Sequence, residues 1–308
     1  MAGLRPAEPA GVPFDAWLRE LRQEALAFGV SAPTLDAAFS SLTPLPRVLE
    51  LQRRQPERRL SYEEYLTRTV SSDRVINGRR QLEAHGALLE EVARQQSVQP
   101  RFVIALWGIE SDFGRRPGEL PVIATLATLA RSGERRPYFR RELLEALAIL
   151  DSGQIALDAM VGSWAGAMGQ CQFMPSNYRR LAVDHDGDGR KDIWSTPADV
   201  FASTARFLSR HGWRDDQTWG RQVLLPSDFD ARISGPDARL RLSRWQDLGV
   251  RRLNGQSLPT RDLWATMLLP DGPRGRAFLV YDNLDVLLNW NRSTHFALAV
   301  GQLADRLR

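Results

Sequence analysis

The sequence predicts a mainly helical α+β protein with one small β-rich segment. Along most of the chain, apolar residues recur at spacings of three and four, as they do from Phe14 to Leu21. After about Thr218 the composition changes to short β-like runs that Gly, Pro and Asp separate. The final stretch returns to the helical period. We therefore expect an N-terminal helical lobe over 1–95, a helical core over 96–218, a β-rich insertion over 219–280 and a C-terminal helix over 281–308 that returns to the core.

Serine residues mark the predicted starts of two helices in the N-terminal lobe. The helices expected there cover Phe14–Leu21, Ser31–Phe39, Ser61–Val70 and Leu82–Ala93. Ser31 is placed to cap its helix, with Pro33 in the first turn. Ser61 and Glu64 have the spacing of a capping box, in which each side chain accepts a hydrogen bond from the other residue's backbone.

Leu and Ala dominate the helices expected in the core, whereas β-like residues dominate the insertion. The core helices cover Val122–Leu129 and Tyr138–Leu150. The expected strands are Val223–Pro226, Arg239–Leu242 and Arg276–Val280.

One carboxyl group is expected on an otherwise apolar helix face. A helix beginning at Pro100 aligns Glu110 with three apolar residues, Val103, Leu106 and Trp107. We expect Gly114 to end this helix. A carboxyl group among apolar side chains loses solvation of its charged form, which raises its pKa and suits a general acid. The pattern alone favours a structural interpretation, namely a Glu held by an Arg or facing water at a helix end.

The segment Ser163–Ser176 has the composition of a sugar-lined cleft. Its small residues allow close backbone approach, Gln172 offers both a donor and an acceptor, and the rings of Trp164 and Phe173 could stack on pyranose faces. A tight contact between helices, with aromatic residues in the core, explains the same composition equally well.

The bulk properties bound the class of protein. The 308 residues include 41 basic and 37 acidic ones, a balance that favours anionic partners such as nucleic acid, a membrane surface or an acidic polymer. However, the basic pairs are scattered and Lys191 is the single lysine, so solvated surface is the favoured interpretation. Cys171 stands alone, which excludes a disulfide framework. Met1–Pro13 lacks the apolar region of a signal peptide. A chain from which the signal peptide had been removed would look the same.

An Asp-rich stretch has the spacing of an EF-hand-type calcium loop. Its first, third, fifth, seventh and ninth positions are Asp184, Asp186, Asp188, Arg190 (through its carbonyl) and Asp192. Position 12 should carry a bidentate carboxylate but is Ser195, which should weaken Ca²⁺ binding. The alternative is a polar turn. The four histidines show no zinc-type spacing, so no catalytic zinc is expected.

Three stretches, in order, resemble the lytic murein transglycosylase B family. The first is Gly108–Gly114, which reads Gly-Ile-Glu-Ser-Asp-Phe-Gly, and the second is Ser163–Ser176. The third is Asn289–Thr294, running into an Ala- and Leu-rich helix. The matches extend from about residue 48 to the C-terminus. The resemblance implies a lysozyme-like helical core over 96–218 that carries the catalytic site.

The resemblance also implies roles for individual residues. Glu110 matches the catalytic acid/base. Residues matching the sugar cleft, or placed where they could add an aromatic face to it, are Ser163, Gln172, Phe173, Trp290, Asn291 and Phe296. Trp164 and Tyr178 are expected to be packing residues. Some family members carry a calcium loop where Asp184 begins one here.

The reaction implied is non-hydrolytic cleavage of the β-1,4 bond between N-acetylmuramic acid and N-acetylglucosamine in peptidoglycan. Glu110 acts as the single acid and base, and the muramyl 6-hydroxyl attacks to give a 1,6-anhydro end. Asp112 lies about 200° around the helix from Glu110 and should face elsewhere. The alternatives are a non-catalytic peptidoglycan-binding module and a hydrolysing muramidase.

The resemblance implies a periplasmic or envelope location, with peptidoglycan strands as the substrate. Other cell-wall enzymes are candidate partners. No nucleic-acid partner is expected, because the sequence has neither a basic stripe nor a known binding motif. The sequence contains no run of 18 apolar residues, so no transmembrane segment is predicted.

Overall fold

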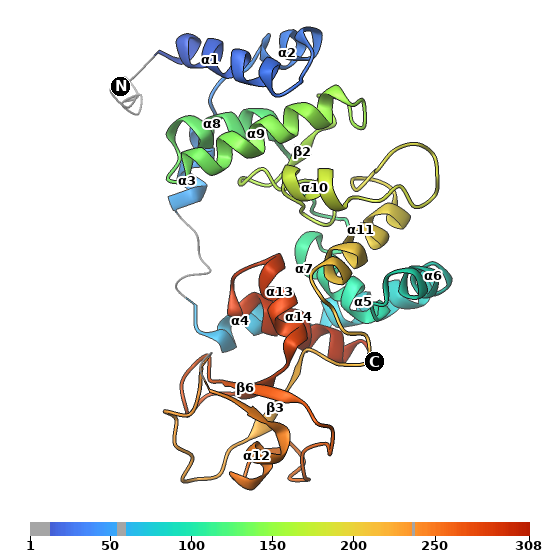
Figure 1. Cartoon of the computed structure of the whole chain (residues 1–308), viewed down its shortest axis with the longest axis vertical. Helices are drawn as coiled ribbons and strands as arrows, with labels where there is room; N and C mark the ends of the chain where they lie inside the picture. Colours follow the sequence, from blue (N-terminus) through green and yellow to red (C-terminus); the bar gives the residue numbers. More distant parts are fainter. Residues whose placement is uncertain (1–12, 54–59, 236–237) are drawn as a thin grey trace. The chain divides into compact units, whose positions relative to one another are not determined.

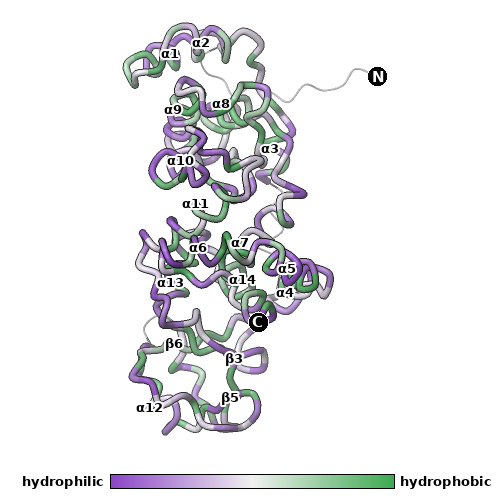
Figure 2. Tube along the Cα trace, turned by 90° about the vertical axis from the view of Figure 1, so that its right-hand side faces the viewer, coloured by the Kyte–Doolittle hydropathy of each residue, from purple (hydrophilic) through white to green (hydrophobic). Residues whose placement is uncertain are grey.

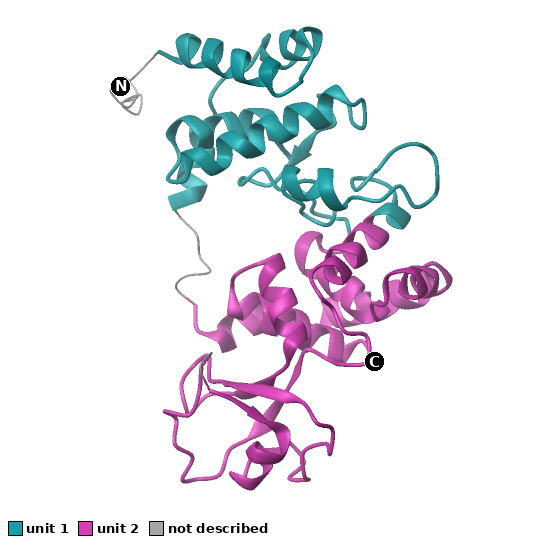
Figure 3. Cartoon of the chain, in the orientation of Figure 1, with its two compact units in different colours: residues 1–55, 114–199 teal, residues 56–113, 200–308 magenta. Residues whose placement is uncertain are grey.

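The computed structural model describes residues 13–53, 60–235 and 238–308, which form two compact units. The first unit combines Met1–Gln55 with Gly114–Asp199, and the second combines Pro56–Phe113 with Val200–Arg308 (Figure 3). Each unit therefore joins segments that are distant in the sequence. The expected four-segment division stays a prediction, and the expectations for Met1–Pro13 lie almost entirely outside the described residues.

Helices α8 and α9 form the centre of the first unit (Figure 1). Leu126 and Leu129 of one helix and Leu143 and Leu147 of the other are fully buried. The elements of this unit are α1 (Phe14–Ala27), α2 (Ala32–Phe39), α3 (Pro46–Arg53), α8 (Val122–Ser132), α9 (Arg136–Asp151), α10 (Pro175–Leu181), β1 (Leu120–Pro121) and β2 (Val161–Gly162). The two short strands pair antiparallel, with Leu120 opposite Gly162.

The N-terminus of α2 is held by a side chain from α9. Ser31 occupies the N-cap position, as expected, but its hydroxyl makes no capping bond within its own helix. It donates instead to Asp151, which also accepts the Thr34 hydroxyl at 2.6 Å. These hydrogen bonds lower the pKa of the Asp151 carboxyl, with Ser31 the largest cause. Tertiary contact has thus replaced the local cap that the sequence indicated.

The second unit contains a helical part and a sheet. Its helices are α4 (Tyr62–Thr69), α5 (Ser72–Ala84), α6 (Gly86–Gln96), α7 (Pro100–Ser111), most of α11 (Pro197–Arg210), α12 (Leu242–Asp247), α13 (Asp282–Trp290) and α14 (Thr294–Arg306). Helix α7 packs on α14 and is apolar over most of its length (Figure 2).

Two expected helices are each divided in the structure. The expected Leu82–Ala93 helix is interrupted at His85, whose ring packs edge-on against Trp107 and Phe201. The expected C-terminal helix is interrupted at Asn291, so that α13 and α14 are separate helices. At His85 the apolar period continues across the break, so periodicity did not detect it, whereas the break at Asn291 lies in a polar run that ends with Ser293 as the N-cap of α14.

A five-stranded antiparallel sheet forms the β-rich part within the described residues. Its strands are β3 (Gly220–Leu224), β4 (Arg239–Arg241), β5 (Arg251–Arg252), β6 (Trp264–Leu268) and β7 (Ala277–Val280), in the order β4-β6-β7-β3-β5. The core on this sheet includes Trp245, whose indole N–H donates to the Ala265 carbonyl at 3.0 Å. The mainly helical fold with a small β-rich insertion is confirmed, although β5, β6 and α12 were not predicted.

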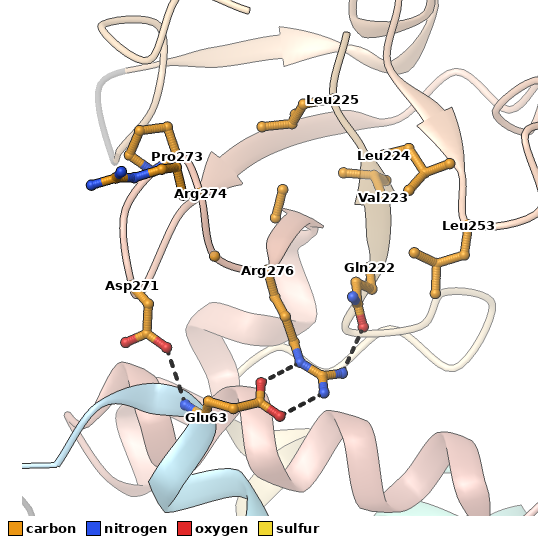
Figure 4. Close-up of a pocket in the computed structure, with 12 residues that line it drawn as sticks. Glu63, Gln222, Val223, Leu224, Leu225, Leu253, Asp271, Pro273, Arg274 and Arg276 are labelled. Carbon is orange, nitrogen blue, oxygen red and sulfur yellow. Dashed lines mark hydrogen bonds and ion pairs between the residues drawn. The ribbon is translucent and has the colours of Figure 1, made fainter. Parts of the chain in front are cut away.

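Side chains fasten α4 to the β-rich part (Figure 4). The expected capping box is present, with Ser61 and Glu64 bonding each other's backbone. Asp271 adds a second cap by accepting the backbone N–H groups of Tyr62 and Glu63 at 2.7 and 3.1 Å. Arg276 donates to both carboxylate oxygens of Glu63, at 2.6 and 2.8 Å, and this hydrogen bonding lowers the pKa of Glu63. Both side chains are partly exposed, so we expect the pair to stabilise the fold by less than ~1 kcal/mol.

A buried carboxyl group connects α9 to α10. Glu142 is 2% exposed and accepts the backbone N–H and the hydroxyl of Ser176 at 2.9 and 2.8 Å, which caps the first turn of α10. Burial raises the pKa of Glu142 despite the opposing effect of these two hydrogen bonds. The folded protein therefore holds a proton on Glu142 at a pH where the unfolded chain releases it.

We expect this shift to appear as a pH-dependent stability difference between the wild type and Glu142→Gln. Because the folded-state pKa is raised, the wild-type free energy of unfolding falls, relative to the variant, as the pH rises from the ordinary Glu pKa through the raised one. Gln keeps a side-chain acceptor but does not titrate. Urea unfolding of both proteins between about pH 4 and pH 7 measures the difference. A difference independent of pH would contradict the raised pKa.

None of the helices in the described ranges is long and apolar enough to cross a membrane.

Candidate active site

Glu110 lies in the last turn of α7 and is held by an indole from the other end of the chain. Its side chain is half-buried. The Trp290 indole N–H donates to Glu110 Oε1 at 2.6 Å, across a separation of 180 residues. This hydrogen bond restricts rotation of the carboxyl group. This contact was not predicted, because the resemblance placed Trp290 only among the residues of the sugar cleft.

Trp290 is itself fixed by packing. It is the last residue of α13, and its ring packs against Phe207 of α11 with centroids 4.7 Å apart and planes at 63°. Such edge-to-face pairs stabilise by ~0.5–1.5 kcal/mol beyond their burial. Phe207 was missed by the sequence analysis, since one Phe on an amphipathic helix gives no signal of its role.

The backbone leaves the helix immediately after the Glu110–Ser111 turn. Helix α7 ends at Ser111, and Asp112, Phe113 and Gly114 have φ of 53°, 59° and 78°. The expectation that Gly114 ends the helix is therefore corrected, because Asp112 is already left-handed. Non-glycine residues in this region cost ~1–3 kcal/mol each, and such strain concentrates at functional sites.

Packing explains how this strained turn persists. The Phe113 ring lies against Gly108, where an added Cβ would come within 2.7 Å of ring atoms. The Arg74 guanidinium lies 3.8 Å from the Asp112 carboxylate. Asp112 therefore ends the helix, in the left-handed conformation of its C-cap.

Ser163 and Gln172 lie in the first unit, on the loop that follows β2. Ser163 accepts the Ala167 N–H with its hydroxyl at 3.2 Å, which closes a tight turn. Gln172 has a φ of 51°, and its amide nitrogen donates to the carbonyls of Pro117 and Gly169 at 2.7 and 2.8 Å. The sequence predicted that Gln172 offers a ligand both a donor and an acceptor. In the structure the amide nitrogen already holds the loop, so we expect only the amide oxygen to bind a ligand.

The two phenylalanines proposed as sugar platforms are buried. Phe173 is 2% exposed and Phe296 is 3% exposed, so neither ring presents a face to solvent. Both rings are therefore interior packing residues, Phe173 on the loop after β2 and Phe296 in the first turn of α14. Asn291 is half-buried and accepts the Ser293 N–H at 3.0 Å, which helps to begin α14. Tyr178 is a packing residue, as expected: it is 2% exposed and its hydroxyl donates to the Lys191 carbonyl at 2.9 Å.

A pocket of about 540 Å³ adjoins Ser163 in the first unit. Its lining includes Gly118 and Gly162, which approach each other so closely that an added Cβ on Gly118 would lie 2.3 Å from the Gly162 carbonyl. This pocket was not predicted from the sequence. The signal available was the Arg115–Arg116 pair, which directly follows the Gly108–Gly114 motif.

The Asp-rich loop has part of the geometry of a cation site. One carboxylate oxygen from each of Asp184, Asp186 and Asp188 lies within 4.8 Å of the others. The carboxylate of Asp192, the expected ninth position, accepts the backbone N–H and the hydroxyl of Ser195. The residue at position 12 is therefore bonded to another proposed ligand. The donor set fits a hard cation in part, with three carboxylates and without a bidentate one.

Comparison with known proteins identifies a family that spans most of the chain. The family model described as transglycosylase SLT domain matches residues 13–305. The chain is 32% identical over 247 residues to membrane-bound lytic murein transglycosylase B of Escherichia coli (strain K12), an alignment covering 78% of this chain and 65% of that protein. The chain thus spans just under two thirds of that relative's length.

Two solved structures share the fold. SltB3 from Pseudomonas aeruginosa, in complex with NAG-anhNAM-pentapeptide, is 44% identical with a TM-score of 0.92, covering 96% of this chain and 79% of that one. Escherichia coli lytic transglycosylase Slt35, in complex with calcium, is 26% identical with a TM-score of 0.79, covering 94% of this chain and 92% of that one. With the family model covering nearly every described residue, the chain belongs to the transglycosylase SLT domain family, as its resemblance to lytic murein transglycosylase B had indicated.

Proposed function

We propose that the chain is a lytic transglycosylase of peptidoglycan, with Glu110 as its single acid and base. The observation that carries the proposal is the half-buried Glu110 carboxyl group at the end of α7, with one oxygen held by the Trp290 indole at 2.6 Å. A general acid must be positioned within hydrogen-bond reach of the atom it protonates. The family membership and the SltB3 complex with a peptidoglycan fragment support the substrate class.

The proposed reaction uses one carboxyl group twice. Protonated Glu110 donates its proton to the glycosidic oxygen as the bond to the muramyl anomeric carbon breaks. The muramyl 6-hydroxyl oxygen then bonds that carbon, and its proton returns to Glu110. The product is a 1,6-anhydro end, and no water is consumed. A retaining hydrolase would instead need a second carboxylate about 5–5.5 Å from the acid.

We propose three groups as direct contacts to the glycan. They are the Ser163 hydroxyl, the amide oxygen of Gln172 and the side chain of Asn291. Trp290 acts in this proposal as a positioning residue for Glu110, in addition to offering an aromatic edge. Phe173 and Phe296 would shape the walls from beneath, because both are buried.

Product identity tests the proposal. Purified protein is incubated with peptidoglycan sacculi beside a Glu110→Gln control, and the soluble products are identified by mass spectrometry. We expect fragments ending in 1,6-anhydro-muramic acid, one water lighter than reducing ends and absent from the control. Reducing ends would make the chain a hydrolysing muramidase. Binding to sacculi without any soluble product would make it a glycan-binding module.

We also propose that the Asp-rich loop binds Ca²⁺ weakly. Its ligands would be Asp184, Asp186 and Asp188, with the Arg190 carbonyl and Asp192 completing one side. The calcium complex of Slt35 supports the presence of such loops in a related fold. The expected affinity is low, on the order of 10⁻⁴–10⁻³ M, because Ser195 replaces the bidentate ligand.

Thermal unfolding with and without calcium tests this site. We expect Tm to rise with millimolar CaCl₂ and to return to its starting value with chelator. Asp188→Asn should abolish the rise, and Ser195→Glu should move it to lower calcium concentrations. An unchanged Tm in the wild type at 10 mM Ca²⁺ (a concentration about ten times the weak limit of such loops) would remove the proposed site.

We propose an envelope or periplasmic location and peptidoglycan strands as the partner. The matched relative is membrane-bound by name, which supports the envelope. Cell fractionation tests the location, and recovery of the protein in the cytoplasmic fraction would contradict it. Other cell-wall enzymes remain proposed partners, and cross-linking in cells would detect them.

A further inference from the structure

The pocket beside Ser163 combines a positive charge with an aromatic wall. It is lined by Arg47, Leu51, Arg115, Arg116, Pro117, Gly118, Glu119, Leu120, Gly162, Ser163 and Trp164. The lining therefore contains three arginines and one acidic residue. All four charged side chains are exposed, while Ser163 and Trp164 are half-buried. An open pocket with this charge balance attracts anions, and its aromatic wall suits a ligand that also carries a sugar.

The basic residues that line this pocket are arginines and not lysines, so their donors have a fixed geometry. The planar guanidinium presents paired N–H donors that match both oxygens of a carboxylate. Arg115 and Arg116 come from the turn after the Gly108–Gly114 motif, and Arg47 comes from α3. Arginines from two different segments therefore line the pocket, which suits the binding of an anionic group.

The arginine-bearing turn is tied to the Ser163 loop within one unit. The Gln172 amide nitrogen donates to the Pro117 carbonyl at 2.7 Å. Leu120 pairs with Gly162 across the two short strands, and Gly118 lies in backbone contact with Gly162. The backbone that carries Arg115 and Arg116 is thus held next to the Ser163 loop, which lowers the ordering cost of binding a ligand that contacts both.

We propose that this pocket, lined by Arg47, Arg115 and Arg116, binds the carboxylate-bearing substituent of a muramyl residue. The inference rests on the proposed function, because it takes Ser163 as a glycan contact. A muramyl residue carries a lactyl group, which is itself a carboxylate when free and bears a peptide with its own carboxylates when substituted. Neutral glycans such as chitin oligosaccharides lack both groups. The pocket would therefore distinguish peptidoglycan from neutral glycans of the same backbone.

The test compares the wild type with Arg47→Ala/Arg116→Ala on two soluble substrates. One is glycan strands that carry stem peptides, and the other is the same strands after an amidase has removed the peptides. Arg19→Ala is the matched control, since Arg19 is an exposed arginine of α1 in the same unit and outside the pocket lining. Circular dichroism confirms that each variant is folded.

We expect the double variant to raise KM by about tenfold or more on peptide-bearing strands, with kcat within about twofold of wild type. Arg19→Ala should leave both constants unchanged. A KM increase confined to peptide-bearing strands identifies the peptide carboxylates as the ligand, whereas an equal increase on both substrates identifies the lactyl carboxylate. A wild-type KM on both substrates would overturn the proposal.

A second readout separates this inference from the proposed reaction. Binding of the two strand types is measured by calorimetry on Glu110→Gln protein, with and without the two arginine substitutions. Weaker binding in the arginine-substituted protein supports the pocket even if no cleavage product is ever found. Equal binding would overturn the pocket while leaving the transglycosylase proposal intact. Because the contact is ionic, its contribution should also shrink as salt rises from about 50 to 500 mM.

Discussion

Glu110→Gln is expected to lower kcat on peptidoglycan strands by about 10²–10⁴-fold, the usual contribution of a general acid and base. Gln is nearly isosteric and can still accept the Trp290 N–H, so the fold and the substrate contacts should persist. It cannot donate a proton to a leaving oxygen or take one from an attacking hydroxyl. The measurement is the initial rate of anhydro-product release, with KM determined alongside kcat.

Asp112→Asn is the matched control for this substitution. Asp112 lies two residues away, but it occupies the left-handed turn after α7, with the Arg74 guanidinium 3.8 Å from its carboxylate. Asn tolerates the left-handed region and keeps the side-chain volume, so we expect a small loss of activity. A loss as large as that of Glu110→Gln would show that a second carboxylate takes part, and the single-carboxylate mechanism would then be wrong.

Trp290→Phe is expected to lower kcat by about tenfold while KM stays within about twofold. The substitution keeps an aromatic ring to pack on Phe207 but removes the N–H that holds Glu110 Oε1. A hydrogen bond to an ionisable group contributes ~1.5–3 kcal/mol, and the carboxyl group would sample more rotamers without it. Since Trp290 acts through Glu110, the loss should fall on kcat rather than on binding.

Two comparisons distinguish this positioning role from general destabilisation. Trp213→Phe removes another indole donor in the same unit, the 2.8 Å bond to Gln99, and should change stability without a comparable loss of kcat. In a Glu110→Gln background, Trp290→Phe should cause little further loss, because the group it positions is already inactive. An additive loss in the double variant would instead show that the Trp290 N–H contacts the substrate directly.

Local sequence signals placed much of the secondary structure correctly. The capping box at Ser61 and Glu64, the start of α7 at Pro100 and the presence of a β-rich insertion follow from short-range patterns, and the structure contains each. Strand β5 was missed because it is two residues long, and β6 (Trp264–Leu268) because its five residues are too few to distinguish a strand from a short helix by periodicity. Residues with strong local preferences need no distant partner to reveal their conformation.

In the candidate site, too, some features follow from the local sequence and others only from the tertiary structure. The sequence by itself determined that Glu110 sits on an apolar helix face within a family motif, and that the Ser163–Ser176 loop is rich in glycine. Only the tertiary structure decided that Trp290 donates to Glu110 and that Phe173 and Phe296 are buried. It alone also placed three arginines around one pocket. Periodicity reports which face of an element is apolar, whereas a contact between residues 180 positions apart depends on how separate elements pack, and no local pattern encodes that packing.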